Sequence, residues 1–118
     1  AMIEKWVAEI KKNADFNELG MILVHNGMVR STAKNGKSVK SMDLTYDKDK
    51  LNSLVNEYRG KEGIVAIKAW INEGLLKVGD DIMYLLVAGK FRTLVLPVFE
   101  ELLSRIKKEI VLVKEFYK

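Results

Sequence analysis

Apolar residues recur at helical spacing near the start of the chain and again in its middle. The first stripe predicts a helix over residues 2–12, because positions three and four apart share one helix face. The second stripe follows Asp47, a typical N-cap residue, and we expect Gly60 to end that helix. The apolar residues of the two stripes are Ile3, Trp6, Val7 and Ile10 in the first, and Leu51, Leu54, Val55 and Tyr58 in the second.

Shorter apolar runs predict strands. Residues 82–88 are continuously apolar and lie between glycines at both ends, which is typical of a strand buried on both faces. Residues 64–71 predict a second strand, and the apolar segment 110–113 resembles a further one. We expect the run at 82–88 to be the centre of the sheet.

A hairpin is predicted in the first half of the chain. Residues 21–32 read as a strand in which Gly27 indicates a bulge or a close backbone approach. The Asn35-Gly36 dipeptide is the strongest short-range signal for a hairpin turn. We therefore expect residues 39–46 to return as a strand beside the first one.

A third helix is predicted directly after the central run. Thr93 is the expected N-cap, and Pro97 is expected in the first turn, where its missing N–H costs little. The basic pair Lys107-Lys108 is expected to close the helix. Its apolar stripe consists of Val95, Val98, Phe99, Leu102, Leu103 and Ile106.

The order of these elements favours an α+β fold with a largely antiparallel or mixed sheet and packed helices over a doubly wound fold. We expect residues 1–118 to form a single domain, and we interpret Ala1, which precedes Met2, as an expression scar. The longest apolar run is far shorter than the ~20 residues of a membrane span, and no secretory segment is visible, so we expect a cytoplasmic protein.

Composition removes several classes of chemistry. The chain has no cysteine, which excludes disulfides, thiolate nucleophiles and zinc ribbons, and it has one histidine, His25, which makes a metal site improbable. The net charge of +4 permits anionic ligands but does not by itself make a nucleic-acid binder.

Four cationic residues lie at or just beyond the ends of predicted strands and helices. Arg30 ends a predicted strand, Arg92 follows the central strand, Lys107 closes the third helix and Lys114 follows four apolar residues. They could form a shared anion site, or each could be an ordinary charge at the end of a strand or helix.

Several short segments together resemble the large, catalytic subunit of molybdopterin synthase. Residues 27–30 (Gly-Met-Val-Arg) resemble its Gly-x-Val-Arg motif, and residues 76–81 (Leu-Lys-Val-Gly-Asp-Asp) resemble its Leu-x-x-Gly-Asp/Glu-x segment. Residues 88–92 (Ala-Gly-Lys-Phe-Arg) occupy the place of its Ser-x-His-Arg motif.

The match then continues without a gap from Arg92 to Lys107, at the position of the family's active-site lysine. Lys114 falls on the lysine of the family's Trp-Lys motif. The resemblance covers about residues 20–116, and the order and spacing of the motifs make it more specific than any motif alone.

The resemblance implies an α/β-hammerhead fold and a homodimer that binds a small ubiquitin-like sulfur-carrier protein at each end, which gives a heterotetramer. The carrier ends in Gly-Gly, and its C-terminal thiocarboxylate inserts into a basic pocket. Its sulfur is transferred to cyclic pyranopterin monophosphate, and two transfers give the dithiolene of molybdopterin. We therefore expect a sulfurtransferase of molybdenum cofactor biosynthesis, with no resident cofactor, no metal, and neither nucleic acid nor membrane as a partner.

The resemblance also implies roles for particular residues. Arg30 and Arg92 would bind substrate, because arginine forks bind phosphate bidentately. Lys107 would lie against the thiocarboxylate carbonyl, and Lys114 would help to bind the pterin, which makes these lysines the candidate catalytic residues. The absence of cysteine is consistent with sulfur that arrives on a partner.

The chain departs from the family pattern at three positions. Phe91 replaces the family's histidine, Val113 replaces its tryptophan, and His25 stands where a phenylalanine is common. Phe91 and His25 would flank the substrate pocket, so His25 could supply the missing imidazole, or it could be a polar strand residue exposed on a sheet face.

These departures leave a second interpretation open. The chain could be a non-catalytic module that binds a ubiquitin-like protein or a phosphate-bearing ligand. A nucleic-acid binder is a third interpretation, but it would require a basic face with exposed aromatic residues, and no such cluster is evident in the sequence.

Overall fold

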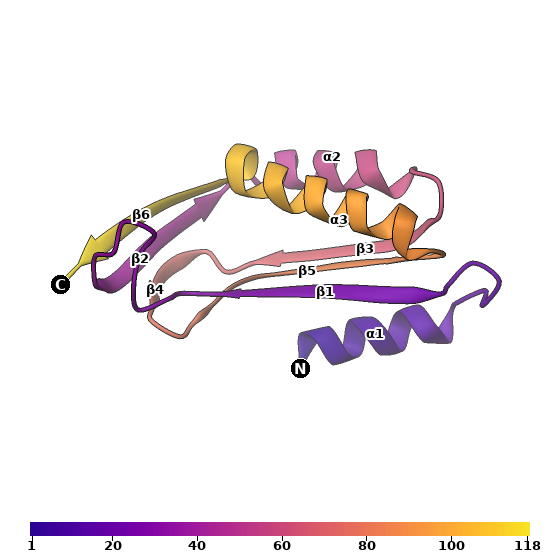
Figure 1. The fold of residues 1–118 in the computed structure, drawn as a ribbon, viewed down its shortest axis with the longest axis horizontal. Helices are drawn as coiled ribbons and strands as arrows, with labels where there is room; N and C mark the ends of the chain where they lie inside the picture. The colour runs from indigo at the N-terminus through magenta and orange to yellow at the C-terminus, as the bar shows by residue number, and fades with distance from the viewer.

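The structure is a computed structural model that describes residues 1–118 and contains three α-helices, a π-helix and six strands (Figure 1). None of these helices is both long and apolar enough to span a membrane. In chain order the elements are α1 (Met2–Lys12), β1 (Met21–Met28), β2 (Val39–Tyr46), α2 (Lys48–Arg59), β3 (Ile64–Ile71), β4 (Gly74–Lys77), β5 (Asp81–Gly89), α3 (Arg92–Arg105), the π-helix (Ile106–Ile110) and β6 (Val111–Tyr117).

Two three-stranded sheets organise the fold. The first has the strand order β1-β5-β3 and the second has the order β4-β2-β6, and every strand pair is antiparallel. The predicted α+β fold is therefore confirmed. The apolar run at 82–88 is indeed the central strand, because β5 pairs on both sides and its residues from Leu85 to Ala88 have no exposed surface.

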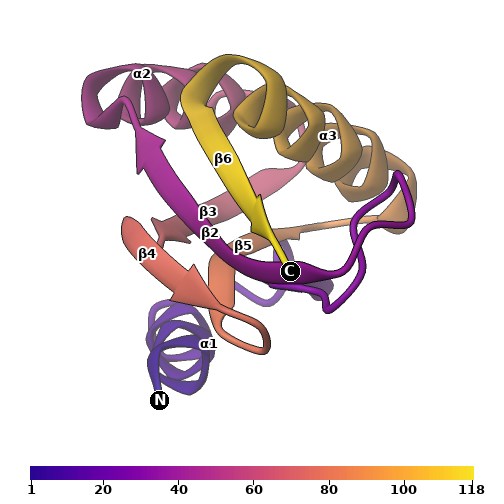
Figure 2. The ribbon, with the colours of Figure 1, turned by 90° about the vertical axis from the view of Figure 1, so that its left-hand side faces the viewer.

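Helices cover both faces of the first sheet. Figure 1 shows α2 and α3 over one face and α1 beneath the other. On the α1 side, Ile10 packs with Leu19, Leu86 and Ala88 in a small separate core. The second sheet lies at one end of the molecule, which measures 51 × 26 × 24 Å, and Figure 2 views that end directly.

The first two helices agree with the sequence pattern. Helix α1 has the predicted bounds, and the predicted stripe of α2 is its buried face. The Asp47 carboxylate accepts a hydrogen bond from the Lys50 N–H at 3.0 Å, and Gly60 is the C-cap. The predicted irregularity at Gly27 is also confirmed, because the β1–β5 register shifts between Gly27 and Met28.

The predicted hairpin is wrong. β1 ends at Met28, and β2 pairs with β4 and β6 in the other sheet, although its bounds are those predicted. The Asn-Gly turn does form, with Gly36 at φ +83°, but it closes only the isolated bridge between Thr32 and Ser38. The reason is tertiary: β4 and β6 occupy both edges of β2, so local turn chemistry does not decide its partner.

Three expectations for α3 are also wrong. Its N-cap is Phe91, whose carbonyl accepts the N–H groups of Leu94 and Val95 at 3.0 Å, and Thr93 is already inside the helix. Pro97 is consequently the sixth residue of α3, beyond the first turn, and is exposed. Lys107 does not close the helix either, because the chain continues as a π-helix to Ile110.

Candidate functional site

A hollow lies where β1, β2, β5, β6 and the π-helix meet. It consists of a cavity of about 550 Å³ and an adjoining hollow of about 330 Å³. We call the combined space the basin. Both parts are lined by Met28, Lys34, Met42, Ile82 and Lys107.

Lys107 reaches the basin from the π-helix. Ile106 and Ile110, at the two ends of this turn, are 0% and 6% exposed and anchor it in the core. Lys107 between them is exposed and lines both parts of the basin. A π-helical turn inside or at the end of an α-helix often marks a functional site. Here it presents a single ammonium group from a buried support.

Arg30 lines the outer part of the basin. The preceding residue, Val29, is buried, and its N–H donates to the Asp80 carbonyl at 2.9 Å. The Val29 carbonyl accepts the N–H of Gly79, also at 2.9 Å. Gly79 has φ +90°, a conformation that favours glycine. The tight turn between β4 and β5 thus fixes the backbone from which Arg30 projects.

His25 lies on β1 and lines the inner cavity together with Lys107. Its ring meets Phe99 edge to face, with 6.4 Å between centroids. Its Nε2 atom is buried and has no hydrogen-bond partner. Burial, and then the charge of Lys107, lower the pKa of the imidazole, so His25 is neutral at neutral pH.

Gly27 explains how the His25 ring fits. A Cβ atom at position 27 would lie 3.1 Å from His25 Nε2, a closer contact than side chains ordinarily accept. The glycine that signals the bulge therefore also leaves room for the imidazole. The sequence analysis left open that His25 is a polar residue exposed on a sheet face. The structure shows instead that the residue is half-buried in the wall of the basin.

Arg92 and Phe91 lie far from the basin within this chain. Both are exposed at the N-terminal end of α3, and Lys90 Nζ lies 5.5 Å from the centroid of the Phe91 ring. The chain is helical from Arg92 through Lys107, and Lys107 follows Arg92 by 107 − 92 = 15 residue steps. At about 1.5 Å per residue, the two ends are about 22 Å apart. One chain does not bring Arg92 to Lys107.

Lys114 is also not brought to the basin. Side chains alternate along a strand, and on β6 it is Val113 and Glu115 that line the two parts of the hollow. Lys114 is paired with Asp43 on the opposite face, and its Nζ lies 5.4 Å from the centroid of the Phe116 ring. Within one chain, Lys107 therefore lies in the basin, whereas Lys114 lies on the face of β6 that is turned away from it.

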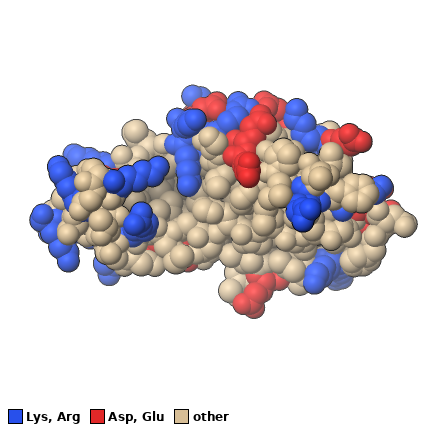
Figure 3. Space-filling view, viewed as in Figure 1, with Lys and Arg blue, Asp and Glu red and all other residues tan.

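The sequence analysis missed one cation and the methionine lining. Lys34 lines both parts of the basin, and Met28, Met42 and Met83 line the inner cavity. Lys34 directly precedes the Asn35-Gly36 turn, and its place in the basin did not follow from the expected hairpin, because β2 belongs to the other sheet. Lys and Arg side chains gather at the end of the molecule formed by β2 and β6 (Figure 3).

This arrangement suits an anion. Three cations, Arg30, Lys34 and Lys107, border a cavity with an apolar lining, where charges attract more strongly than in open water. The neutral His25 adds a hydrogen-bonding group without adding charge. No group of three or more His, Cys, Asp or Glu side chains is placed to hold a metal ion.

Comparisons with known proteins agree with this architecture. The family model described as MoaE protein matches residues 3–109. A molybdopterin synthase structure from Staphylococcus aureus has a TM-score of 0.76 at 19% identity, over 95% of this chain and 84% of that one. A MoaE protein from Burkholderia ambifaria also has a TM-score of 0.76 at 19% identity, over 99% of this chain and 81% of that one.

Two further relatives extend the comparison. A complex of subunits 1 and 2 of the molybdopterin-converting factor from Helicobacter pylori includes a chain with a TM-score of 0.74 at 18% identity. The alignment covers 98% of this chain and 80% of that one. An uncharacterised protein of Methanocaldococcus jannaschii is 28% identical over 95 residues, which are 77% of this chain and 80% of the relative. At these identities the structural matches establish a shared fold.

Proposed function

The chain belongs to the MoaE family, and from this premise we propose that it is the large, catalytic subunit of a molybdopterin synthase. Family membership supports a role in molybdenum cofactor biosynthesis. The observation that carries the finer proposal is the basin, where Lys107 from the π-helix meets Arg30 and Lys34 beside an apolar cavity.

In the proposed reaction the basin receives two anions. One is the C-terminal thiocarboxylate of a small ubiquitin-like carrier that ends in Gly-Gly, and the other is the phosphate-bearing pterin precursor. Arg30 and Lys34 attract these groups, and Arg30 offers phosphate a planar fork of donors. The ammonium of Lys107 would bind the thiocarboxylate anion before its sulfur bonds to the pterin. When water then cleaves the acyl–sulfur bond and releases the carrier as a carboxylate, the same ammonium would stabilise the negative charge that develops on the carbonyl oxygen.

We further propose that the complete site is shared between two copies of the chain. Arg92 lies about 22 Å along the helix from Lys107, which is too far for both to hold one small substrate. A two-fold axis can place Arg92 and Phe91 of one copy beside the basin of the other. The same arrangement would allow Lys114, which faces away from its own basin, to contribute from the second copy. With one carrier at each end, the assembly would be a heterotetramer.

A binding module without catalysis is the alternative, and two observations favour it. Val113, at the place of the family's tryptophan, lines the inner cavity, and Phe91 provides no imidazole. A site without that tryptophan and that imidazole would retain the carrier's tail through its cations without transferring sulfur.

The deciding experiment supplies the thiocarboxylated carrier and the pterin precursor and measures molybdopterin. We expect the wild-type chain to form product and Lys107→Ala to abolish it while the fold remains intact. Lys108→Ala is the matched control, because Lys108 belongs to the same π-helix and is exposed but lines neither part of the basin. Carrier binding without product in the wild type would favour the binding module, and equal activity of both variants would remove Lys107 from catalysis.

The shared site is tested by mixing inactive variants. Arg92→Ala and Lys107→Ala homodimers should each be inactive. After random reassembly in equal amounts, half of the dimers contain one copy of each variant and have one intact site, so about a quarter of wild-type activity should return. No recovery, despite demonstrated exchange of subunits, would contradict the shared site.

A further inference from the structure

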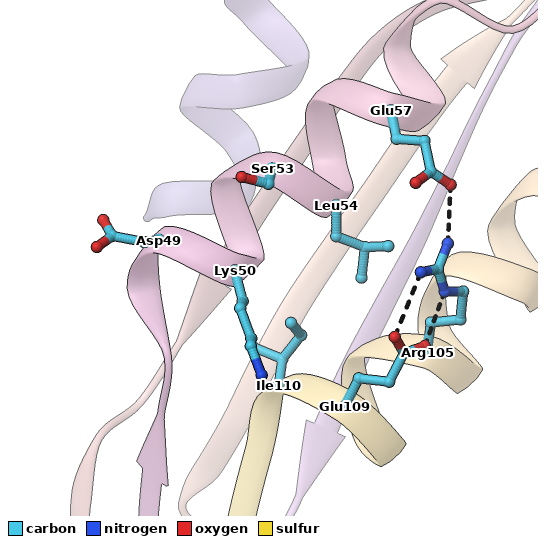
Figure 4. A pocket seen from close by; sticks show the side chains of 8 residues that line it. All are labelled: Asp49, Lys50, Ser53, Leu54, Glu57, Arg105, Glu109 and Ile110. Atoms are coloured by element: carbon cyan, nitrogen blue, oxygen red, sulfur yellow. Dashed lines mark hydrogen bonds and ion pairs between the residues drawn. The ribbon is translucent and has the colours of Figure 1, made fainter.

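A second charged cluster lies between α2 and the C-terminal end of α3, and it is separate from the basin. Its centre is Arg105, the last residue of α3 (Figure 4). Arg105 donates from Nε to Glu109 Oε2 at 2.7 Å and from Nη2 to Glu109 Oε1 at 3.3 Å. It also donates from Nη1 to Glu57 Oε2 on α2 at 2.8 Å. One guanidinium thus holds a carboxylate on each side.

A buried tyrosine fixes the guanidinium from a third direction. Tyr58 is 1% exposed, and its hydroxyl accepts a hydrogen bond from Arg105 Nη1 at 3.3 Å. The same hydroxyl donates to Glu101 at 2.5 Å. Hydrogen bonds from Arg105 also lower the pKa of the Glu109 carboxyl, so this partner is charged over the ordinary pH range. The bidentate contact between Arg105 and Glu109 fixes the orientation of the two side chains as well as the distance between them.

The pair of Arg105 and Glu109 spans the turn that carries Lys107. Arg105 precedes the π-helix, Glu109 lies within it, and Lys107 stands between them in sequence. Glu109 and Arg105 line a hollow with residues of α2, whereas Lys107 lines the basin. A π-helical turn is rarer than an α-helical one and needs support from its surroundings. The ion pairs supply that support on the side that faces α2.

We propose that Arg105 is a positioning residue for Lys107, which acts by clamping the π-helical turn to Glu109 and to α2 so that the lysine faces the basin. The catalytic importance of this clamp rests on the proposed function, but the orientation of Lys107 does not. It can therefore be tested on the chain alone.

The chain contains its own reporter of that orientation. His25 is the only histidine, so its imidazole signals in an NMR spectrum need no assignment among several rings. It lines the inner cavity with two cations, Lys34 and Lys107, and the adjoining hollow is bordered by one further cation, Arg30, and one carboxylate, Glu115. The charge of Lys107 contributes to the lowered pKa of His25, so a lysine that moves away raises that pKa.

The experiment compares NMR titrations of His25 in wild type, Lys107→Met, Arg105→Met and Glu109→Gln. Lys107→Met defines the direction of the shift, which should be upward. Removing the charge of Arg105 would by itself raise the pKa of His25, whereas removing the charge of Glu109 would by itself lower it. If the clamp positions Lys107, both variants should raise the pKa. An unchanged or lowered pKa in Glu109→Gln would overturn the proposal.

Tyr58→Phe controls for a general loosening of the packing between α2 and α3. It removes the hydroxyl from the same cluster but keeps both carboxylate contacts of Arg105, so it should lower the Tm and leave the His25 titration unchanged. A shift as large as that of Glu109→Gln would mean that any local destabilisation moves Lys107, which would also overturn the proposal.

The sulfur-transfer assay then separates the two proposals. If wild type is active, Glu109→Gln should lower kcat more than it changes KM, because the basin cations that bind substrate remain in place. If wild type is inactive, the proposed function fails, while the titrations still decide whether the clamp orients Lys107.

Discussion

The two sheets have the same number of strands but differ in how they are covered. Helices pack on both faces of β1-β5-β3, whereas the second sheet packs on one face only. Strand pairing places Leu75, Leu112 and Phe116 on its outer face, where they are 68%, 73% and 39% exposed. The first sheet therefore buries more apolar surface than the second and contributes more to stability, because burial of apolar surface is the main favourable contribution to folding.

The basin lies at the boundary between these regions. His25 and Ile82 come from the first sheet, Met42 and Val113 come from the second, and Lys107 comes from the turn where the helical layer ends. A site needs accessible space next to rigid support. The sheet β1-β5-β3, which has helices on both faces, offers the support, and the sheet β4-β2-β6, which is packed on one face only, leaves the space.

The largest expected effect of a substitution lies in the covered sheet. Leu86 has no exposed surface and packs in the core beneath α1, so Leu86→Ala should lower the free energy of unfolding by about 2–5 kcal/mol. Urea denaturation at equilibrium measures this loss. Leu44→Ala is a useful companion, because Leu44 is equally buried on the covered face of the second sheet. If Leu86→Ala lowered the free energy of unfolding by less than about 1 kcal/mol, the stated difference between the two sheets would be contradicted.

The second prediction concerns His25, which lies at the boundary between the two sheets, and the dependence of folding stability on pH. His25 has a lowered pKa in the folded protein, so between its folded and unfolded pKa values the unfolded chain binds more protons. Stability should therefore be complete above about pH 6.5 and should fall as the pH drops through the folded pKa. Each tenfold difference in proton affinity between the states corresponds to about 1.4 kcal/mol.

The measurement is the free energy of unfolding between pH 7 and pH 5 for wild type and His25→Gln. The difference between them should change over this interval, because the variant lacks the titrating group while the carboxyl groups are shared by both chains. Parallel pH profiles would show that the imidazole is equally basic in both states and is not enclosed by the basin.

Local patterns predicted most of the elements but not all of their partners. The apolar stripe of α2 and the continuous run in β5 specify their own burial, so their bounds and roles follow from the sequence. The Asn35-Gly36 turn shows the limit, because it forms as expected while β2 pairs elsewhere. Strand pairing between distant segments depends on which edges are free in the whole fold, and no short motif contains that information.

The candidate site was predictable to the same degree. Arg30 and His25 lie in the basin with Lys107, as the resemblance suggests. Within a single chain, the other three candidates, Arg92, Phe91 and Lys114, lie outside the basin. The alternation of side chains along a strand is enough to put Lys114 and Val113 on opposite faces of β6. The π-helix and its Arg105 clamp had no such signal, because an i,i+4 pair of Arg105 and Glu109 is also what an ordinary α-helix displays.

The smallest expected effect is on the uncovered face. Leu112→Ala makes the same chemical change as Leu86→Ala, but Leu112 is 73% exposed and little of its surface leaves water on folding. Its free energy of unfolding should change by less than about 0.5 kcal/mol, measured by urea denaturation at low protein concentration. A loss of more than about 2 kcal/mol that grows with protein concentration would show that a second chain covers this face in solution. The contrast between the two sheets would then belong to the isolated chain and not to its assembly.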